Sequence, residues 1–485
     1  MGSTATSGAA VLVSINPSNG EKVAEVTIAT LEDVDLAVNR AWEAFRLSGW
    51  RSLRPDQRAT TLYKISQSLL AEKEHLAHLQ MADNGKPLNE CRGMVDTAAG
   101  VFRYYAALIE TMETEVTPPR GEYVSLTVVE PFGVVVAITP WNSPLIADAQ
   151  KVAPALAVGN AVILKPSEES PLLAPELLRI CLAAGLPSGQ LQVLQGPGET
   201  IGAALVANRG VRMISFTGGT NTGRAIARVA GDRLVPVALE LGGKSPHIVF
   251  ADADLDEAAQ GVVAGIFSSS GQSCVAGSRM FVERSVYDRV VARVVELANA
   301  IIVSNPEDPD VEVGPLVSQR HRKSVAGYVD LARSEGGRVL CGGSFPTDPQ
   351  LANGAYYMPT VIEGLANTAR TVREEIFGPV LVALPFDSED DLIEQANDSP
   401  YGLACGIWTG DFRKAWRVAR QIEAGSVWVN TYKQSVISSP FGGFKDSGIG
   451  REKAEVGLRA YGETKSIFFG LQQEPIRLAR GRRLV

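Results

Sequence analysis

The chain has 485 residues, of which 45% are hydrophobic and 21% are charged. This length exceeds one hydrophobic core of ordinary size, so we expect two or three globular domains. The net charge of −8 argues against nucleic acid or an anionic membrane as the main partner. Composition and charge therefore favour a protein that acts on a small molecule.

The amino-terminal segment and the cysteines indicate in which cellular compartment the protein is expected. "MGSTATSGAA" lacks the cationic start and apolar stretch of a signal peptide, and no uncharged run reaches the ~18 residues of a membrane-spanning helix. The five cysteines are scattered without a C-x-x-C pair, so we predict reduced thiols rather than disulfides or a zinc site. The one close histidine pair, His75 and His78, is assigned to a solvated helix face. We expect a cytoplasmic protein without a metal.

The first hundred residues predict a hairpin followed by helices. Residues 15–29, "INPSNGEKVAEVTIA", alternate apolar and polar residues around a Pro/Asn/Gly turn, which is typical of a hairpin. Residues 54–84 carry apolar side chains at helical spacing, and Gly85 and Pro87 follow them. This pattern predicts helical structure that ends at Gly85.

From residue 124 the pattern changes to short β-branched runs that alternate with helical segments. The runs are "GVVVAITP", "NAVILKPS", "LQVLQG", "VRMISFTGG" and "VPVALELGG". Apolar strands joined by helices predict a parallel, doubly wound sheet. A second strand-helix series runs from "KSPHIVFADADLDEAAQGVVAGIF" to "AGSVWVN". The predicted fold class is α/β, with two doubly wound Rossmann-like domains and a small β element.

Two further segments fit neither series. "YVSLTVVEPFG" (residues 123–133) and "YGETKSIFFG" (residues 461–470) read as free strands. Each is expected to pair with a sheet edge, possibly on another subunit, or to form a local hairpin.

Two apparent nucleotide motifs fail on spacing. In "GPGETIG" the last glycine, Gly202, comes one residue too late for G-x-G-x-x-G. In "LGGKS" the first glycine of a phosphate loop would fall at Ala238. A dinucleotide on this sheet would therefore bind without the usual glycine fingerprint.

Polar residues follow the strands of the first series, in "TPWNSP", "LKPSEES", "SFTGGTNTGR" and "LELGGKSP". Ligands of open α/β sheets collect at such strand ends. With "GQSC", "EEIFGPV" and "SPFGGFKDSGIGRE", these stretches resemble, in order and spacing, the aldehyde dehydrogenase superfamily. The resemblance runs from about residue 15 to about residue 468. It implies a cofactor-binding domain of residues 1–116 and 134–243, a catalytic domain of 244–445, and bridging or oligomerisation strands with a tail in 117–133 and 446–485.

The resemblance implies a catalytic set of Cys274, Glu240, Asn142 and Lys165. Cys274 is the expected nucleophile, and half ionisation at pH 7 needs its thiol pKa lowered by about 1.5 units. The small residues after it, up to Gly277, should leave room for nicotinamide and aldehyde. Asn142 and the Cys274 N–H should bind the oxyanion. Glu240, flanked by leucines, should have a raised pKa and activate the water that cleaves the thioester.

The same resemblance implies a cofactor site and favours NAD. Its residues are Thr139, Pro140, Trp141, Lys165, Ser167, Glu168, Phe216, Gly218, Gly219, Gly223, Leu241, Gly242, Glu375 and Phe377. The Glu168 carboxylate would repel a 2′-phosphate, which favours NAD over NADP. Gly219 and Asn221 replace the commoner Ser and Glu of the family, so NADP is not excluded.

The substrate is an aldehyde of open identity. Its expected contacts are Asn142, Ser143, Gln150, Cys274 and Phe441. Small or polar residues at 143, 147 and 150 imply a roomy, polar tunnel, and Gln150 replaces one aromatic of the cage that binds cationic amino-aldehydes in relatives. Arg103 and Lys433 could meet a substrate carboxylate, but each is more often a plain surface charge.

The expected function is NAD(P)-dependent oxidation of an aldehyde to a carboxylic acid, through a thiohemiacetal and a thioester on Cys274. Two alternatives remain: acyl transfer to coenzyme A, which Glu240 disfavours, and a non-catalytic protein that retains the fold. By resemblance we expect a homodimer or homotetramer.

Overall fold

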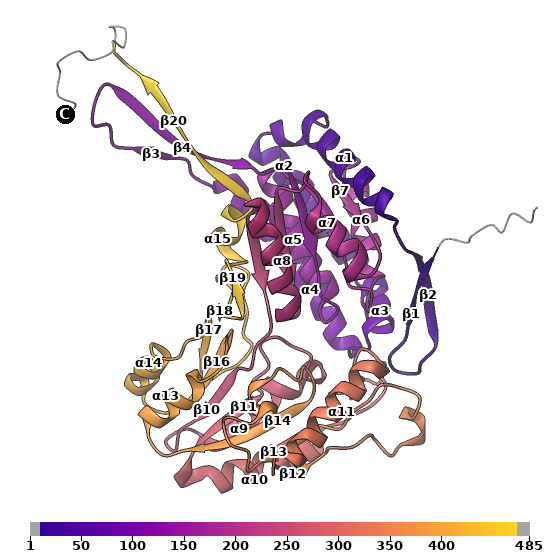
Figure 1. Cartoon of the computed structure of the whole chain (residues 1–485), viewed down its shortest axis with the longest axis vertical. Helices are drawn as coiled ribbons and strands as arrows, with labels where there is room; N and C mark the ends of the chain where they lie inside the picture. The colour runs from indigo at the N-terminus through magenta and orange to yellow at the C-terminus, as the bar shows by residue number, and fades with distance from the viewer. Residues whose placement is uncertain (1–9, 473–485) are drawn as a thin grey trace, which may run out of the picture.

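The computed structural model describes residues 10–472, and Figure 1 shows two α/β bodies with an arm of strands that extends from them. The first body contains a six-stranded sheet in the order β19-β9-β8-β5-β6-β7. Its strands are β5 (Val134–Ile138), β6 (Ala161–Lys165), β7 (Leu191–Val193), β8 (Met213–Thr217), β9 (Val237–Glu240) and β19 (Gly448–Ile449). All but β19 are parallel, so the predicted doubly wound sheet is confirmed.

Helices cover both faces of this sheet. One layer consists of α2 (Pro55–Ala71), α3 (Lys73–Asn84), α4 (Leu88–Thr111), α5 (Pro144–Val158) and α6 (Leu173–Ala183), and the other of α1 (Leu31–Leu47), α7 (Ala203–Ala207) and α8 (Thr220–Arg233). On β5, Val135 packs with the first layer and Val136 with the second. Because successive side chains point to opposite faces, burial on both sides requires the continuous apolar strands seen in the sequence.

The second body contains a seven-stranded sheet in the order β12-β13-β14-β11-β10-β16-β17, in which only β12 is antiparallel. Its strands are β10 (Pro246–Val249), β11 (Arg279–Glu283), β12 (Arg338–Cys341), β13 (Thr360–Glu363), β14 (Val380–Phe386), β16 (Ala404–Trp408) and β17 (Ser426–Val429). Its helices are α9 (Leu255–Phe267) and α10 (Tyr287–Ala300) on one face, and α11 (Gln319–Ser334), α12 (Arg370–Arg373), α13 (Glu389–Asn397) and α14 (Phe412–Ala419) on the other. A short pair of strands, β15 (Tyr401–Gly402) and β18 (Phe444–Lys445), lies beside it.

The arm contains the two segments, residues 123–133 and 461–470, that fit neither strand-helix series. It consists of β3 (Glu115–Thr117), β4 (Tyr123–Pro131) and β20 (Gly462–Gly470), and α15 (Ala454–Arg459) precedes β20. β4 forms a local hairpin with β3 and pairs antiparallel with β20 from Tyr123↔Gly470 to Pro131↔Gly462. Both segments thus pair with each other within the chain, and one of them also forms the expected local hairpin.

The amino-terminal predictions need one refinement. β1 (Val11–Ile15) and β2 (Lys22–Thr27) form the expected hairpin. The helical stretch ends at Gly85, which has a left-handed φ of +78°, but it is divided into α2 and α3 at Glu72. Apolar spacing did not reveal this break because Leu69 and Leu76, on either side of it, face the same core.

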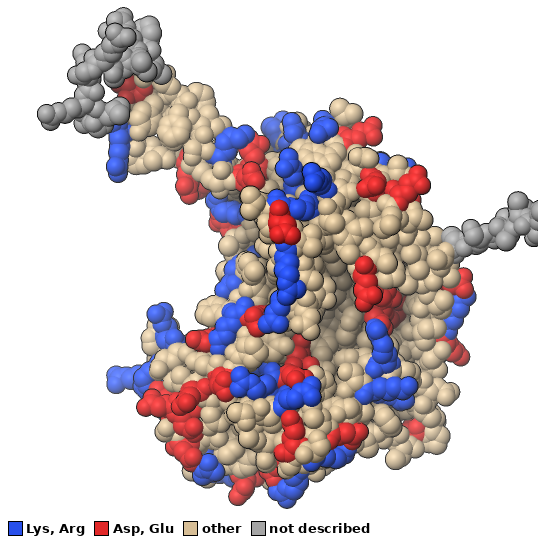
Figure 2. All heavy atoms as spheres, in the orientation of Figure 1, with Lys and Arg blue, Asp and Glu red and all other residues tan. Residues whose placement is uncertain are grey.

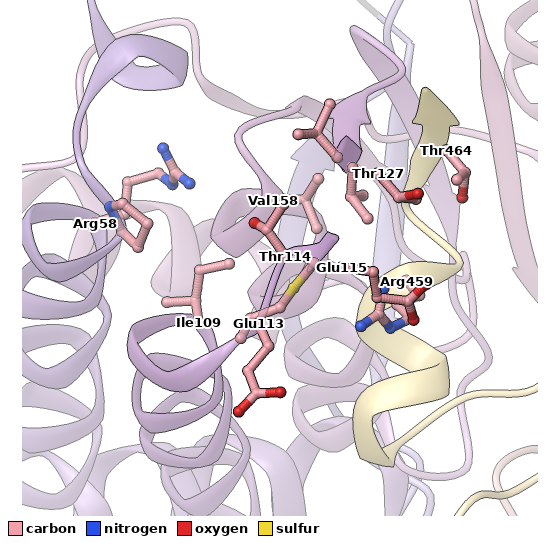
Figure 3. A pocket seen from close by; sticks show the side chains of 13 residues that line it. Arg58, Ile109, Glu113, Thr114, Glu115, Thr127, Val158, Arg459 and Thr464 are labelled. Atoms are coloured by element: carbon pink, nitrogen blue, oxygen red, sulfur yellow. The ribbon is translucent and has the colours of Figure 1, made fainter. Parts of the chain in front are cut away.

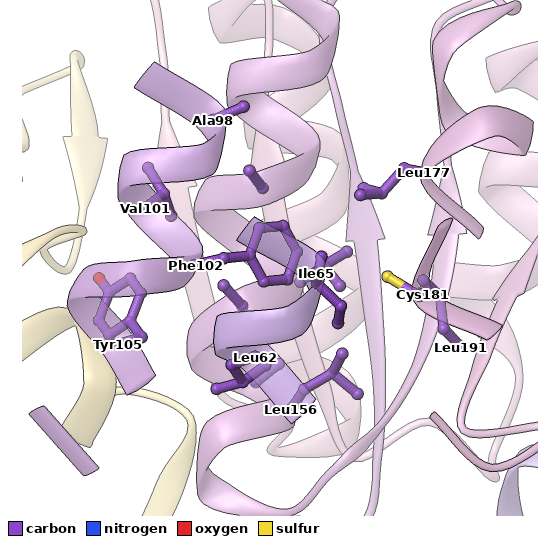
Figure 4. Close-up of a cluster of buried hydrophobic side chains, with 14 of the residues drawn as sticks. Leu62, Ile65, Ala98, Val101, Phe102, Tyr105, Leu156, Leu177, Cys181 and Leu191 are labelled. Atoms are coloured by element: carbon purple, nitrogen blue, oxygen red, sulfur yellow. The ribbon is translucent and has the colours of Figure 1, made fainter. Parts of the chain in front are cut away.

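The cysteines are free thiols, and four of the five are buried. Cys181 lies in the core of the first body with Leu177 and Leu191, as Figure 4 shows. His75 and His78 are exposed on α3, and within residues 10–472 no cluster of His, Cys, Asp and Glu could hold a metal ion. In the same range no helix combines the length and apolarity needed to cross a membrane.

Candidate active site

A cavity of about 550 Å³ lies between the two bodies, and Cys274, Asn142 and Glu240 line it. Asn142 follows β5, Glu240 ends β9, and Cys274 follows α9 of the second body. The first two therefore lie at the carboxyl edge of the first sheet, where open α/β sheets bind ligands. Lys165 ends β6 at the same edge but does not line this cavity.

The loop before Cys274 has a strained backbone. Ser269 and Ser270 have φ of +56° and Gly271 has φ of +70°. A non-glycine residue in this left-handed region costs of order 1–3 kcal/mol and is held there by its surroundings. Here Glu90 accepts hydrogen bonds from the Ser269 N–H (3.0 Å) and hydroxyl (2.6 Å). The fold therefore fixes the backbone that presents Cys274.

The residues after Cys274 pack against Tyr432 and His247. The Tyr432 hydroxyl donates to the Val275 carbonyl oxygen (2.9 Å), and the Tyr432 ring stacks on His247 with ring centroids 4.4 Å apart. A Cβ on Gly277 would lie 2.7 Å from His247 Nδ1. Gly277 is therefore needed for the close approach of His247, a reason that the sequence did not suggest.

Burial opposes ionisation of the Cys274 thiol. It raises the thiol pKa to about 12, two nearby carboxylates add to this effect, and two lysines oppose it. The pKa is therefore shifted in the direction opposite to the expected lowering. Asn142 Nδ2 donates to the carbonyl oxygen of Gln272 (3.0 Å), which places an amide donor beside the same loop.

Glu240 is buried at the end of β9, with only 3% of its surface exposed. Burial raises its pKa well above the ordinary range, and the nearby Glu452 raises it further. Its Oε2 atom has no hydrogen-bond partner among the residues that the structure describes. The expected raised pKa is confirmed, and a buried carboxyl with a free oxygen suits a general base.

The two glycines after Glu240 allow the bodies to meet. A Cβ on Gly242 would lie 2.2 Å from the Glu375 carboxylate, and one on Gly243 would lie 2.5 Å from the carbonyl oxygen of Cys274. Glu375 also accepts a hydrogen bond from the Gly243 N–H (3.0 Å), and burial raises its pKa to about 7. The "LGG" of the failed phosphate loop is therefore the junction that brings Cys274 and Glu375 to the first sheet.

A candidate nucleotide site adjoins the same sheet edge. The ammonium of buried Lys165 lies 3.1 Å from Glu168 Oε2, and the Gly198 N–H donates to Glu168 Oε1 (3.4 Å). Burial raises the pKa of Glu168, but Lys165 and these hydrogen bonds outweigh it and leave the pKa below its usual range. Glu168 is therefore ionised at neutral pH.

The amino terminus of α8 offers free N–H groups. Its first residue, Thr220, follows Gly219, which makes no side-chain cap, and a Cβ on Gly219 would meet open space. Gly223 permits contact between α8 and the sheet, because a Cβ there would lie 2.4 Å from Leu241. An uncapped helix amino terminus binds a phosphate readily.

The remaining predicted cofactor residues lie around this edge. Trp141 and Phe377 contact each other edge-on, with ring centroids 5.2 Å apart. His321, which the sequence did not suggest, packs against both rings and hydrogen-bonds the Phe377 carbonyl oxygen through Nε2 (2.7 Å). The others follow or end strands of the first sheet: Thr139, Pro140, Ser167, Phe216 and Gly218.

The predicted substrate residues line the cavity together. They are Asn142, Ser143, Gln150, Cys274 and Phe441, joined by Ala147. Arg103 is exposed on α4, as expected for a surface charge. For Lys433 that interpretation is wrong, because its side chain lines the cavity and burial lowers its pKa to about 8.

Comparison with known proteins identifies the family. The profile of the aldehyde dehydrogenase family matches residues 4–467. A betaine aldehyde dehydrogenase of Bacillus subtilis (strain 168) is 41% identical over 455 residues, which cover 94% of this chain and 93% of that protein. The chain belongs to the aldehyde dehydrogenase family.

Solved structures of other dehydrogenases have the same fold. A putative aldehyde dehydrogenase from Burkholderia cenocepacia superposes with a TM-score of 0.94 at 40% identity, covering 97% of this chain and 96% of that one. A betaine aldehyde dehydrogenase point mutant from Staphylococcus aureus, in complex with NAD+, superposes with a TM-score of 0.94 at 36% identity, covering 96% and 95%.

One functional pair of this dehydrogenase was missed in the sequence. Lys151 on α5 is fully buried, and its ammonium contacts the Glu452 carboxylate and donates to the Ser215 hydroxyl (3.1 Å). Glu452 reaches the cavity because it forms a β-bridge with Phe441. A lone lysine in the apolar helix "PLIADAQKVAPALAV" was the available signal, since such a charge needs a buried partner.

This pair leads to a prediction on pH dependence in the dehydrogenase. Glu452→Gln removes a negative charge beside Glu240 and leaves the Lys151 ammonium unpaired, and both changes lower the pKa of Glu240. A base works only when deprotonated, so the acid limb of the kcat–pH profile should move to lower pH. Glu455→Gln, which removes an exposed partner of Arg459 on α15, is the control and should leave the profile in place. An unmoved or raised acid limb in Glu452→Gln would contradict this coupling.

A second cavity of the dehydrogenase, of about 310 Å³, lies at the base of the arm (Figure 3). Arg58 lines it but donates to the backbone carbonyl oxygens of Ala157 (2.8 Å) and Leu53 (2.5 Å). It contains no cysteine, and its polar groups serve the junction of the arm with the helices. The space-filling view in Figure 2 shows acidic and basic residues interspersed on the visible face, so no large patch of one sign marks a polyanion site there.

Proposed function

We propose that this aldehyde dehydrogenase converts an aldehyde to a carboxylic acid with NAD, using Cys274 as nucleophile, Asn142 as oxyanion donor and Glu240 as general base. The proposal is carried by one observation, the convergence of these three side chains on a single cavity. Lys165, Glu168, Glu375 and the amino terminus of α8 are assigned to the cofactor. The Bacillus subtilis relative is named for betaine aldehyde, which is therefore included in the substrate panel below.

The chemistry assigned to each residue follows from its position. The Cys274 thiol gives its proton to water and its sulfur attacks the aldehyde carbon, while Asn142 Nδ2 and the Cys274 N–H donate to the new oxyanion. Bound NAD would supply the hydride acceptor, so that the carbon attached to Cys274 loses its hydride and becomes a thioester, and the positive ring of NAD would favour the thiolate. Glu240 then takes a proton from a water, the water oxygen attacks the thioester carbon, and the carboxylic acid leaves as the thiol is restored.

The residues at the nucleotide edge fit NAD. The open space at Gly219 and the uncapped N–H groups of α8 suit a pyrophosphate, and the ionised Glu168 suits a ribose with free hydroxyls. A 2′-phosphate would be brought against the Glu168 carboxylate.

Cofactor choice can be tested at Glu168. In Glu168→Gln the repulsion of a 2′-phosphate is removed, so the ratio of kcat/KM with NADP to that with NAD should rise about tenfold. Steady-state kinetics with both cofactors measure it, and Glu176→Gln, which removes an exposed partner of Arg179 on α6, is the control. A ratio that stays at the wild-type value would remove Glu168 from cofactor selection.

The function itself is tested by NADH formation with a panel of neutral, anionic and cationic aldehydes, betaine aldehyde included. We expect oxidation of at least one member, with release of free acid and no stimulation by coenzyme A, because Glu240 supports hydrolysis. A rate that depends on coenzyme A would favour acyl transfer instead, and a protein that binds no dinucleotide would favour the non-catalytic alternative.

We also propose a role for each region of the chain and an oligomeric state. We assign cofactor binding to residues 1–116 and 134–243, catalysis to 244–445, and bridging to 117–133 and 446–485. Residues 1–9 and the tail from 473 to 485 lie outside the described residues. The arm extends from the body (Figure 1), and Phe468 and Phe469 on β20 are 65% and 52% exposed. Exposed aromatic side chains on a projecting sheet support a homodimer or homotetramer. Five free thiols support a reducing compartment, the cytoplasm.

A further inference from the structure

Two lysines with no acidic partner line the cavity of the proposed active site. Lys433 and Lys453 both face it, on the segment that follows β17. Within residues 10–472, neither ammonium has a carboxylate oxygen within 4.0 Å. By contrast, ion pairs with a carboxylate are formed by Lys86, Lys151, Lys165, Lys414 and Lys445. Buried or half-buried charges without a counterion are costly, so this arrangement calls for an explanation.

Lys433, which is half-buried, lines the cavity. Its ammonium donates to the Ser268 hydroxyl (2.8 Å), and burial lowers its pKa to about 8. Glu90, the carboxylate that acts electrostatically on Lys433, is already engaged, because it pairs with Lys86 (3.7 Å) and accepts two hydrogen bonds from Ser269. Lys433 therefore lines the cavity without a fixed counterion among the described residues.

Lys453 is the second cation. Its ammonium lies 4.8 Å from the centroid of the Phe441 ring and donates to the Ser435 hydroxyl (2.7 Å). The adjacent carboxylate, Glu452, is occupied by buried Lys151. Burial lowers the pKa of Lys453, which means that its charged form lacks full compensation.

The backbone at both positions supports a binding role. Lys433 and Lys453 have φ of +56° and +62°, in the left-handed region that costs a non-glycine residue of order 1–3 kcal/mol. Such strain is common at ligand clamps, where the surrounding structure holds a side chain in place. Two strained lysines on one cavity form a preorganised site for a negative charge.

The charge balance of the cavity points the same way. The charge of Glu452 is offset by Lys151, and burial of Glu240 disfavours its charged form. Lys433 and Lys453 are the cations of the cavity that no ion pair in the described part of the chain compensates, and both also act electrostatically on Cys274. The cationic side of the cavity is thus close to the nucleophile.

We propose that the physiological substrate is a short aldehyde with a carboxylate at its other end, an ω-oxo acid, whose carboxylate is bound by Lys433 and Lys453. This inference rests on the proposed function, because it names the substrate class of the same site. The product is then a dicarboxylate. A quaternary ammonium aldehyde would bring its cation against two ammonium groups, and Gln150 provides no aromatic face for it.

The test compares substrates that differ only in this charge. Succinic semialdehyde and its methyl ester have the same carbon chain and aldehyde, but only the acid carries a carboxylate. With NAD, kcat/KM for the acid should exceed that for the ester by about tenfold or more, as expected for charge-assisted hydrogen bonds. Betaine aldehyde, the cationic arm, should be the poorest of the three.

Variants at Lys433 and Lys453 test whether these two lysines cause the preference for the acid over the ester. In Lys433→Gln/Lys453→Gln the ratio of acid to ester kcat/KM should fall toward one, and Lys433→Arg/Lys453→Arg should restore part of it. The ratio is used because both lysines also act on Cys274, an effect that both substrates share. The inference would be overturned if the wild type used acid and ester equally, or if the ratio were unchanged in the glutamine variant. In either case, oxidation of the ester would still support the proposed function. Failure to oxidise any aldehyde would overturn the proposed function and this inference with it.

Discussion

Cys274→Ser should reduce NAD-dependent aldehyde oxidation at least about a thousandfold, because a serine hydroxyl in this buried site is far harder to ionise than a thiol. No other cysteine can substitute, since the other four are buried away from the cavity. NADH formation under saturating aldehyde and NAD measures the loss.

The matched control is Cys341→Ala. Cys341 ends β12, the edge strand of the second sheet, and its thiol does not line the cavity. This variant should retain turnover. If Cys274→Ser retained it as well, Cys274 would not be the nucleophile, and the proposed mechanism would be wrong.

Glu240→Gln should separate the two halves of the reaction. Attack by Cys274 does not require the Glu240 carboxylate, so one burst of about one NADH per active site is expected. Hydrolysis of the thioester requires a base, and removal of a general base costs about 10²–10⁴-fold in rate. Steady turnover should fall by that factor, as measured by rapid mixing.

Glu423→Gln is the control for this experiment, because Glu423 is an exposed carboxylate paired with Lys445 outside the cavity. It should show wild-type steady turnover. Undiminished steady turnover in Glu240→Gln would assign the base to another group, with Glu452 as the first candidate because it lines the same cavity.

The sequence predicted well those features that local pattern determines. The runs around Val135, Ile163 and Ile214 became central parallel strands because their side chains are buried on both faces. Residues that directly end such strands, such as Lys165 and Glu240, could be assigned to the ligand-binding edge. For these elements, strand periodicity and motif order contain the required information.

Features that depend on contacts between distant segments could not be predicted. The pairing of β4 with β20 joins residues more than three hundred positions apart, and neither strand specifies the other. Lys433 looked like a surface charge because only the folded loop after β17 turns it into the cavity. The Lys151–Glu452 pair and the raised pKa of Cys274 likewise arise from burial at the junction of the two bodies.

The central claim, that oxidation passes through an acyl group on Cys274, can be tested by mass spectrometry of Glu240→Gln mixed with NAD and an aldehyde that the wild type oxidises. The variant should accumulate the acyl mass, and peptide mapping should place it on Cys274. NADH formation with no adduct on Cys274, or with the adduct on another residue, would contradict the account.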